Sequence, residues 1–204
     1  MRIEIDPFRP RPRAVSQVAD ILKDGGIIVY PTDTVYGLGC MITNKQGIEK
    51  INLIKTSKKP KSIMLSDIKE ISLYAKVSNE AFRLMRLLLP GPYTFILPAT
   101  RLVPRLLQRG RKAVGVRIPD HWFCKAIVET VGEPIITTSI PLSDEQIHVD
   151  PLEIESQFGH MVDIIVDSGI LPDIPSTILS LETDTLEIIR RGLGTTDMFE
   201  PQER

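Results

Sequence analysis

The sequence predicts an α/β protein: a single-domain, twisted mixed β-sheet with flanking helices and an open basic cleft. Short runs rich in Val and Ile alternate with helical patterns over most of the 204 residues, which is typical of such folds. No low-complexity linker and no internal repeat divides the chain. Hydroxyl or cationic side chains also stand at the ends of five predicted strands: Thr34, 57–61, Arg117, Ser139 and Ser176. We expect the domain to cover residues 10–192, with 1–9 as an N-terminal strand and arm and 193–204 as a tail.

Length and composition are those of an ordinary globular protein. The chain is 42% hydrophobic and 25% charged, and its length is enough to bury a sizeable core. Because no run of about 18 apolar residues occurs, no membrane-spanning helix is expected, and the first residues lack the apolar core of a signal peptide. Cys40 and Cys124 fit no metal or redox spacing. We therefore expect two free thiols, no bound metal and a cytoplasmic location.

Charge is unevenly distributed along the chain, although the net charge is only −1. Residues 1–125 contain 22 lysines and arginines against 10 acidic residues, whereas residues 126–189 contain 13 acidic residues and neither lysine nor arginine. This asymmetry predicts an electropositive region suited to an anion. The alternative is that folding mixes the two segments and leaves no basic patch.

In the first half of the chain, strands are expected at residues 2–5, 27–30 and 62–66, and helices at 14–23, after Asn44, and at 67–75 and 78–89. The strands are rich in Val and Ile, whose branched Cβ atoms favour the pleated backbone. Prolines at positions 7, 10 and 12 predict an extended arm before residue 14 rather than a helix. Gly25-Gly26 ends the first helix, and the Asn44 side chain suits the cap of the second.

In the second half, strands are expected at residues 93–97, 113–117, 133–136, 162–166, 177–181 and 186–191, and helices at 103–108, 121–131 and 151–158. Leu89-Pro90-Gly91-Pro92 separates the first of these strands from the preceding helix. Strands and helices therefore alternate to the end of the chain, where the last residues are expected to fray.

The stretch Ile27–Cys40 organises the other elements. It opens with a buried strand, which Pro31 ends because proline has no backbone donor. Three short polar residues at 32–34 follow, and hydroxyls or carboxylates at such a strand exit are typical ligand contacts in α/β folds. The same residues also suit a tight turn that caps itself, so the chemistry alone leaves both interpretations open.

Two cationic features could hold an anion. Lys55 begins a run with four ammonium groups in seven residues, which would attract phosphates; a solvated helix end favoured by the macrodipole is the alternative. Arg117 ends a predicted strand, and its planar fork of five donors suits a carboxylate or phosphate. The alternative for Arg117 is a structural ion pair.

Residues 31–39, Pro-Thr-Asp-Thr-Val-Tyr-Gly-Leu-Gly, closely resemble the Pro-Thr-Glu-Thr-Val-Tyr-Gly-Leu-Gly signature of the YrdC family, the threonylcarbamoyl-AMP synthases of tRNA modification. Four more segments are similar to family motifs: 89–94, 114–121, 175–178 and 190–192. The resemblance spans roughly residues 10–192. It implies the YrdC-like fold and a reaction that joins L-threonine, bicarbonate and ATP into threonylcarbamoyl-AMP and pyrophosphate.

The resemblance also implies roles for residues at matching positions. The amino acid would be contacted by Thr34, Arg117, Ser139 and Ser176, and the nucleotide by Lys55 and Arg190. ATP would be a substrate accompanied by Mg²⁺, with no bound organic cofactor, no metal held by the protein and no covalent catalytic residue.

The nucleotide side departs from the family's pattern. Its Lys-x-Arg is Lys55-Thr56-Ser57 here, and its Ser-x-Asn is Ser139-Ile140-Pro141, so an arginine and an asparagine are missing. These departures resemble the YciO branch, which shares the run Thr94-Phe95-Ile96-Leu97. They imply a weak or specialised threonylcarbamoyl-AMP synthase-like enzyme linked to tRNA t6A modification.

The charge distribution suggests a second class of function. The YrdC fold is associated with double-stranded RNA and tRNA binding through a basic concave surface, so an RNA-binding protein with little or no synthase activity is the alternative. The candidate RNA-binding residues are Lys58, Lys59, Lys61, Arg109, Arg111 and Lys112. The threonine-side motifs favour the enzyme, whereas the altered nucleotide side and the basic first 125 residues favour RNA. No membrane partner is expected.

Overall fold

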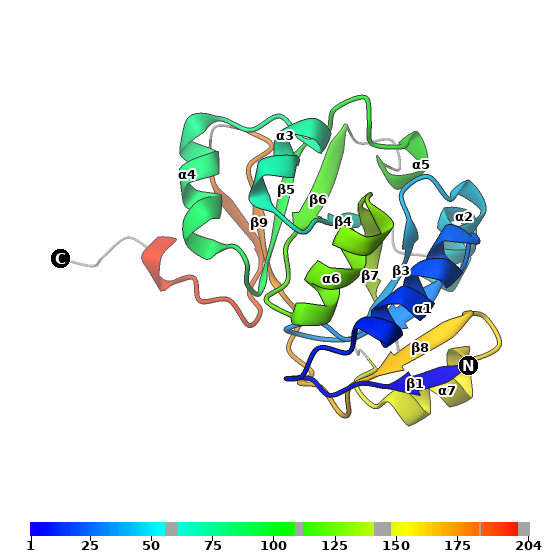
Figure 1. The fold of residues 1–204 in the computed structure, drawn as a ribbon. Coiled ribbons are helices and arrows are strands. Elements are labelled where there is room, and N and C mark those ends of the chain that lie inside the picture. The colour runs from blue at the N-terminus through cyan, green and yellow to red at the C-terminus, as the bar shows by residue number, and fades with distance from the viewer. Residues whose placement is uncertain (56–60, 109–111, 141–147, 184, 200–204) are drawn as a thin grey trace.

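The computed structural model describes residues 1–55, 61–108, 112–140, 148–183 and 185–199. Within these ranges ten strands form one mixed sheet (Figure 1). The strands are β1 (Arg2–Glu4), β2 (Ile28–Tyr30), β3 (Gly37–Met41), β4 (Ser62–Met64), β5 (Tyr93–Pro98), β6 (Ala113–Arg117), β7 (Ile135–Ser139), β8 (Ile164–Asp167), β9 (Thr177–Ser180) and β10 (Glu187–Arg190). The α-helices are α1 (Pro12–Lys23), α2 (Lys45–Ile54), α3 (Ile71–Tyr74), α4 (Asn79–Leu88), α5 (Arg105–Gln108), α6 (Trp122–Val131) and α7 (Pro151–Phe158). The predicted α/β class with a mixed sheet in one domain is confirmed.

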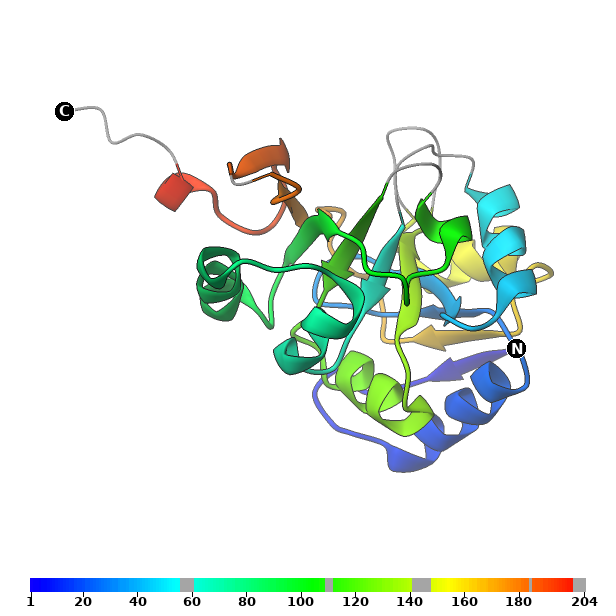
Figure 2. The same cartoon turned by 90° about the horizontal axis from the view of Figure 1, so that it is seen from above.

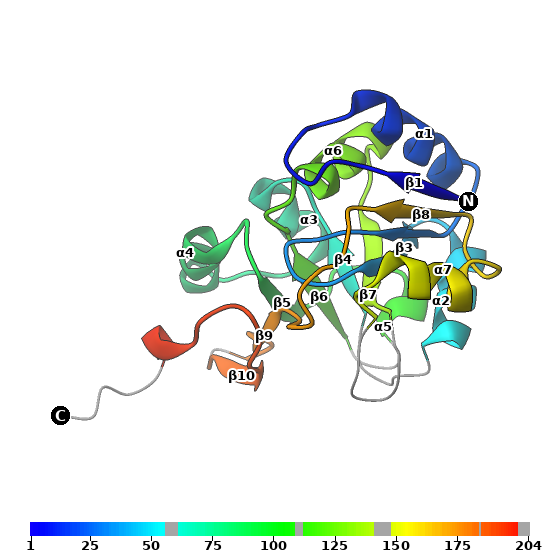
Figure 3. The ribbon, with the colours of Figure 1, turned by 90° about the horizontal axis from the view of Figure 1, so that it is seen from below.

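Strand order in the sheet is β1-β8-β2-β3-β7-β4-β6-β5-β9-β10. The pairs β1–β8, β2–β8, β4–β6 and β5–β9 are parallel, and the other neighbours are antiparallel. Strands β1 and β10 are the two edges and lie at opposite ends of the molecule (Figure 3). The N-terminal residues therefore extend the sheet rather than lying apart from it.

Helices cover both faces of the sheet, and each face has its own apolar cluster. Helices α1 and α6 lie side by side on one face (Figure 2), where their apolar side chains pack with Ile28, Met64 and Ile135. We call this the α6 face. Strand residues alternate between faces, so the intervening residues, such as Val29 and Ile136, pack in the other cluster with α2, α3, α4, α5 and α7.

Part of the α6 face carries small and polar residues in place of large apolar ones. Gly39, Thr137, Ser62 and Gly115 are successive partners across strands β3, β7, β4 and β6. A Cβ atom on Gly115 would lie 2.3 Å from Ser62 Oγ, and one on Gly39 would lie 2.2 Å from the carbonyl oxygen of Ile136. This row therefore forms a floor of short side chains in the middle of the sheet.

The structure corrects the predicted elements in three places. Helix α1 begins at Pro12, two residues before the predicted start, because proline suits the first helical position. Strand β3 was not predicted, since glycines at 37 and 39 disfavour a strand. Strand β7 continues to Ser139, three residues beyond the predicted end, so its hydroxyl residues lie within the ladder rather than after it.

Other local predictions are confirmed. Asn44 caps α2 by accepting a hydrogen bond from the Gly47 amide at 2.9 Å, and β2 ends at Tyr30, directly before Pro31. Cys40 and Cys124 are free and buried. In the part of the chain that the structure describes, no helix is long and apolar enough to cross a membrane.

Candidate functional site

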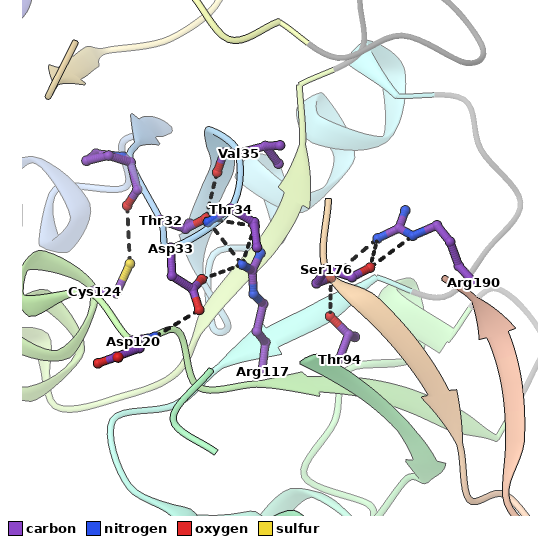
Figure 4. Close-up of polar contacts among 11 residues, drawn as sticks. Thr32, Asp33, Thr34, Val35, Thr94, Arg117, Asp120, Cys124, Ser176 and Arg190 are labelled. Carbon is purple, nitrogen blue, oxygen red and sulfur yellow. Dashed lines mark hydrogen bonds and ion pairs between the residues drawn. The ribbon is translucent and has the colours of Figure 1, made fainter. Parts of the chain in front are cut away.

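Arg117 lies at the end of β6 and reaches the loop between β2 and β3 (Figure 4). Its Nη2 donates to Asp33 Oδ1 at 2.6 Å, to Thr32 Oγ1 at 3.2 Å and to Thr34 Oγ1. Three strands separate β2 from β6 in the sheet. This contact therefore requires the twist of the sheet and the length of the loop, and it joins segments more than 80 residues apart.

The loop at residues 32–34 is held in place by its own side chains. Thr32 Oγ1 donates to the Val35 carbonyl at 2.7 Å and accepts from the Thr34 amide at 3.1 Å. Asp33 uses its second oxygen, Oδ2, to accept from the Asp120 amide at 3.1 Å. The self-capping turn, one of the two interpretations that the sequence left open, is thus present, and contact of this loop with a ligand stays a prediction.

The Arg117–Asp33 contact is a buried ion pair. Only 9% of the Arg117 side chain and 10% of the Asp33 side chain are exposed, which confirms the ion-pair interpretation of Arg117. Its Nε, however, is buried and has no hydrogen-bond partner in the described part of the chain. An unpaired buried donor is costly, so Arg117 retains one donor that a ligand could satisfy.

A second contact joins Ser176, Thr94 and Arg190. Arg190 donates to the Ser176 carbonyl from Nε at 3.1 Å and from Nη2 at 2.7 Å, and to Ser176 Oγ at 3.3 Å. Ser176 Oγ is in turn 2.8 Å from Thr94 Oγ1. Thr94 was not among the predicted site residues, although its place in the 89–94 motif was a signal that could have identified it.

The third contact joins Lys55 and Ser139. Lys55 Nζ donates to Ser139 Oγ at 2.7 Å and to the Ser139 carbonyl at 3.0 Å. Ser139 of β7 pairs with Gly37 of β3, and Gly37 follows Thr34 by three residues. The ammonium group that follows α2 therefore contacts the end of β7, the strand that pairs with β3.

The three contacts join the six candidate residues in pairs, and two of the pairs combine a residue assigned to the amino acid with one assigned to the nucleotide. Thr34 meets Arg117, Ser176 meets Arg190, and Ser139 meets Lys55. Burial lowers the pKa of Arg190, and the positive charge of Arg117 lowers it further. The positive charges of the two guanidinium groups therefore repel each other.

Tyr30 is a site residue that the sequence did not reveal. Its ring lies over Gly37 and Gly39, where added Cβ atoms would come within 2.8 and 3.1 Å of ring atoms. Its hydroxyl is buried without a hydrogen-bond partner in the described ranges, and burial raises its pKa. A tyrosine in an apolar strand looks like a core residue in sequence, so only the fold places its ring over the two glycines of the signature.

Neither of the two cysteine thiols is suited to nucleophilic chemistry. Burial raises the pKa of the Cys40 thiol to about 12, and it also raises the pKa of Cys124, which donates to the Pro31 carbonyl at 3.2 Å. Both groups are therefore protonated near neutral pH. In the described ranges, no three His, Cys, Asp or Glu side chains gather as a metal-ligand set.

The candidate RNA-binding residues have mixed outcomes. Lys58, Lys59, Arg109 and Arg111 lie outside the described residues, as do Ser57 and Pro141. Lys61, which immediately precedes the central strand β4, is only 4% exposed, so it does not lie on an exposed basic surface as that assignment expected. Lys112 is exposed. RNA binding remains a prediction from sequence.

The fold and these side chains define a class of protein: an α/β domain whose sheet gathers cationic and hydroxyl groups suited to small anionic ligands. A family model for Sua5, YciO and YrdC proteins, described as "Telomere recombination", matches residues 20–192. The chain belongs to this Sua5/YciO/YrdC family.

Individual relatives extend the comparison. The uncharacterized protein YciO of Escherichia coli strain K12 is 41% identical over 199 residues, covering 96% of this chain and 97% of YciO. The crystal structure of E. coli YciO matches with a TM-score of 0.93 over 98% of this chain and 99% of that chain, at 40% identity. P. abyssi Sua5 complexed with L-threonine matches with a TM-score of 0.87 at 26% identity, over 94% of this chain and 57% of that chain.

Proposed function

We propose that this protein binds L-threonine and ATP on the α6 face and acts as a weak or specialised threonylcarbamoyl-AMP synthase. The observation that carries the proposal is the contact of Arg117 with the Thr32–Thr34 loop. Membership of the Sua5/YciO/YrdC family and the likeness to a Sua5 complexed with L-threonine support it.

The amino-acid side of the proposed site retains its functional groups. The buried Nε of Arg117 offers a charged donor to a carboxylate. Ser176 and Arg190 add a hydroxyl and a second cation. The central row of the α6 face, which includes Ser62 and Gly115, carries short side chains.

The nucleotide side retains less. In the proposed reaction a carbamate oxygen attacks the α-phosphorus of ATP and pyrophosphate leaves, so negative charge grows on phosphate oxygens and fixed cations stabilise it. Lys55 supplies one cation, whereas the arginine expected two residues later is Ser57. Losing one such donor typically lowers the rate by about 10²–10³-fold. Mg²⁺ would enter with the nucleotide phosphates, which it prefers as ligands.

The proposal is tested by measuring pyrophosphate release from ATP with L-threonine and bicarbonate, omitting each in turn. We expect slow release, below about 1 s⁻¹, that requires all three substrates. Arg190→Gln should lower it further, whereas Arg86→Gln, at an exposed position of α4, should not. Release that is indifferent to L-threonine contradicts the proposal.

A gain-of-function variant tests the account of the missing cation. Ser57→Arg should raise threonine-dependent release toward that of an ordinary enzyme, because a guanidinium group can form two charged hydrogen bonds to a phosphate. Ser57→Lys is the matched control, since it adds the charge without the fork. If wild type already turns over at about 1 s⁻¹ or faster, the missing arginine was not needed.

A further inference from the structure

The ion pair of Asp33 and Arg117 presents two opposite charges side by side at the candidate site. Asp33 Oδ1 lies 2.6 Å from Arg117 Nη2. We propose that Asp33 receives the α-ammonium group of the ligand while Arg117 receives its α-carboxylate, so that the site selects amino-acid zwitterions over simple carboxylic acids. The inference rests on the proposed function, because it assigns a specificity-determining residue to the same site.

Asp33 is fixed in position rather than poised to move aside. Oδ1 is held by Arg117 and Oδ2 by the Asp120 amide at 3.1 Å. The flanking Thr32 and Thr34 are themselves bonded to each other. A ligand therefore meets a stationary carboxylate next to the arginine, and displacing it would break contacts at both oxygens.

Charge balance decides which ligand fits. The Arg117–Asp33 pair is neutral as a unit, so an acid carrying only a carboxylate would be attracted by Arg117 and repelled by Asp33 at nearly the same distance. An α-amino acid carries its ammonium and carboxylate groups on the same carbon atom. Its ammonium group can therefore contact Asp33 while its carboxylate contacts Arg117, and both contacts are charge-assisted hydrogen bonds.

Both partners retain unused hydrogen-bonding capacity. A carboxylate has about four acceptor positions, and the two contacts of Asp33 use two of them. Arg117 keeps its buried Nε without a partner in the described part of the chain. Asp33 remains 10% exposed, so a small ammonium group can reach it.

The test is calorimetric titration of wild type, Asp33→Asn and Asp33→Glu. The ligands are three zwitterions (L-threonine, L-serine and L-alanine), 3-hydroxybutanoate, which lacks the ammonium group, and L-threoninol, which lacks the carboxylate. Wild type should bind a zwitterion at least about tenfold more tightly than either partial ligand. Asp33→Asn should lose about tenfold or more in affinity for the zwitterion while binding 3-hydroxybutanoate at least as well as wild type. Asp33→Glu keeps a carboxylate and matches the glutamate of the YrdC signature, so it should retain the preference for zwitterions that Asp33→Asn loses.

Three outcomes overturn the inference. In the first two, Asp33→Asn binds the zwitterions with unchanged affinity, or it binds both the zwitterions and 3-hydroxybutanoate more tightly than wild type does. The third outcome is that wild type binds none of the zwitterions. A gain for both ligands would make Asp33 an internal competitor of the carboxylate. If L-serine or L-alanine binds with the expected dependence on Asp33 and L-threonine does not, the inference holds and the proposed substrate is wrong. The fluorescence of Trp122 reports whether each variant is folded.

Discussion

Replacing Arg117 by methionine removes the cation that holds the candidate site together. The variant keeps an unbranched side chain of similar length, so most of the apolar packing of the stem remains. It leaves Asp33 as a buried carboxylate that, in the described part of the chain, keeps its hydrogen bond from the Asp120 amide at 3.1 Å. Thr32 and Thr34 also lose a donor to their hydroxyl oxygens.

The magnitude follows from burial. Because both side chains of the pair are about one-tenth exposed, solvent screens the interaction little, and removing one partner of such a pair costs about 3–5 kcal/mol. That is a large fraction of the 5–15 kcal/mol by which domains are typically stable. With a urea slope of about 2 kcal/mol/M, the unfolding midpoint should fall by about 1.5–2.5 M.

The assay is urea unfolding followed by the fluorescence of Trp122, the one tryptophan of the chain. Lys125→Met is the matched control, because it breaks the exposed pair with Glu129, 3.9 Å away, and should change the unfolding free energy by less than about 1 kcal/mol. The double variant Arg117→Met with Asp33→Asn should recover about 1–3 kcal/mol relative to the sum of the single effects. Additive effects within about 0.5 kcal/mol would refute the buried-pair reasoning.

Two further predictions concern the frame of the site. Gly39→Ala should unfold the domain or destabilise it by more than about 3 kcal/mol, because its Cβ would lie 2.2 Å from the Ile136 carbonyl oxygen. Gly169→Ala meets no atom within 4 Å and should cost about 1–2 kcal/mol, because its φ of +87° disfavours alanine; equal losses in urea unfolding would contradict this. Burial lowers the pKa of His121 below the ordinary histidine value of 6.5, so the unfolded chain takes up this proton more readily and stability is lost as pH falls below 6.5. His121→Asn, which keeps an acceptor for the Phe123 amide, should flatten that loss in unfolding experiments between pH 7 and about 5; an unchanged slope would exclude His121 as its source.

Local sequence patterns were enough to predict most elements of the fold. Helix α7 has the predicted bounds, and the Asn44 cap is confirmed, because hydrophobic spacing and cap chemistry act over a few residues. Strand β3 escaped prediction because glycines at 37 and 39 disfavour a strand, whereas in the folded sheet the ring of Tyr30 packs over both. That contact is a property of the assembled sheet and not of the residues of β3 alone.

The candidate site divides in the same way. Thr34, Arg117 and Ser176 could be selected from the sequence because they follow or precede strands and match family motifs. The side chains that these residues contact could not be predicted, because Asp33 and Arg117 are 84 residues apart in sequence and Thr94 and Ser176 are 82 apart. Which side chains share the α6 face depends on strand order, and strand order is not encoded in any local pattern.

The central claim is that Arg117 and its loop bind L-threonine, and a crystal structure of the protein with L-threonine tests it most directly. The account predicts one threonine on the α6 face, its carboxylate within hydrogen-bonding distance of Arg117 and its ammonium group on Asp33, with the Arg117–Asp33 contact still intact. Threonine bound elsewhere, or a site that stays empty at saturating L-threonine, would contradict it.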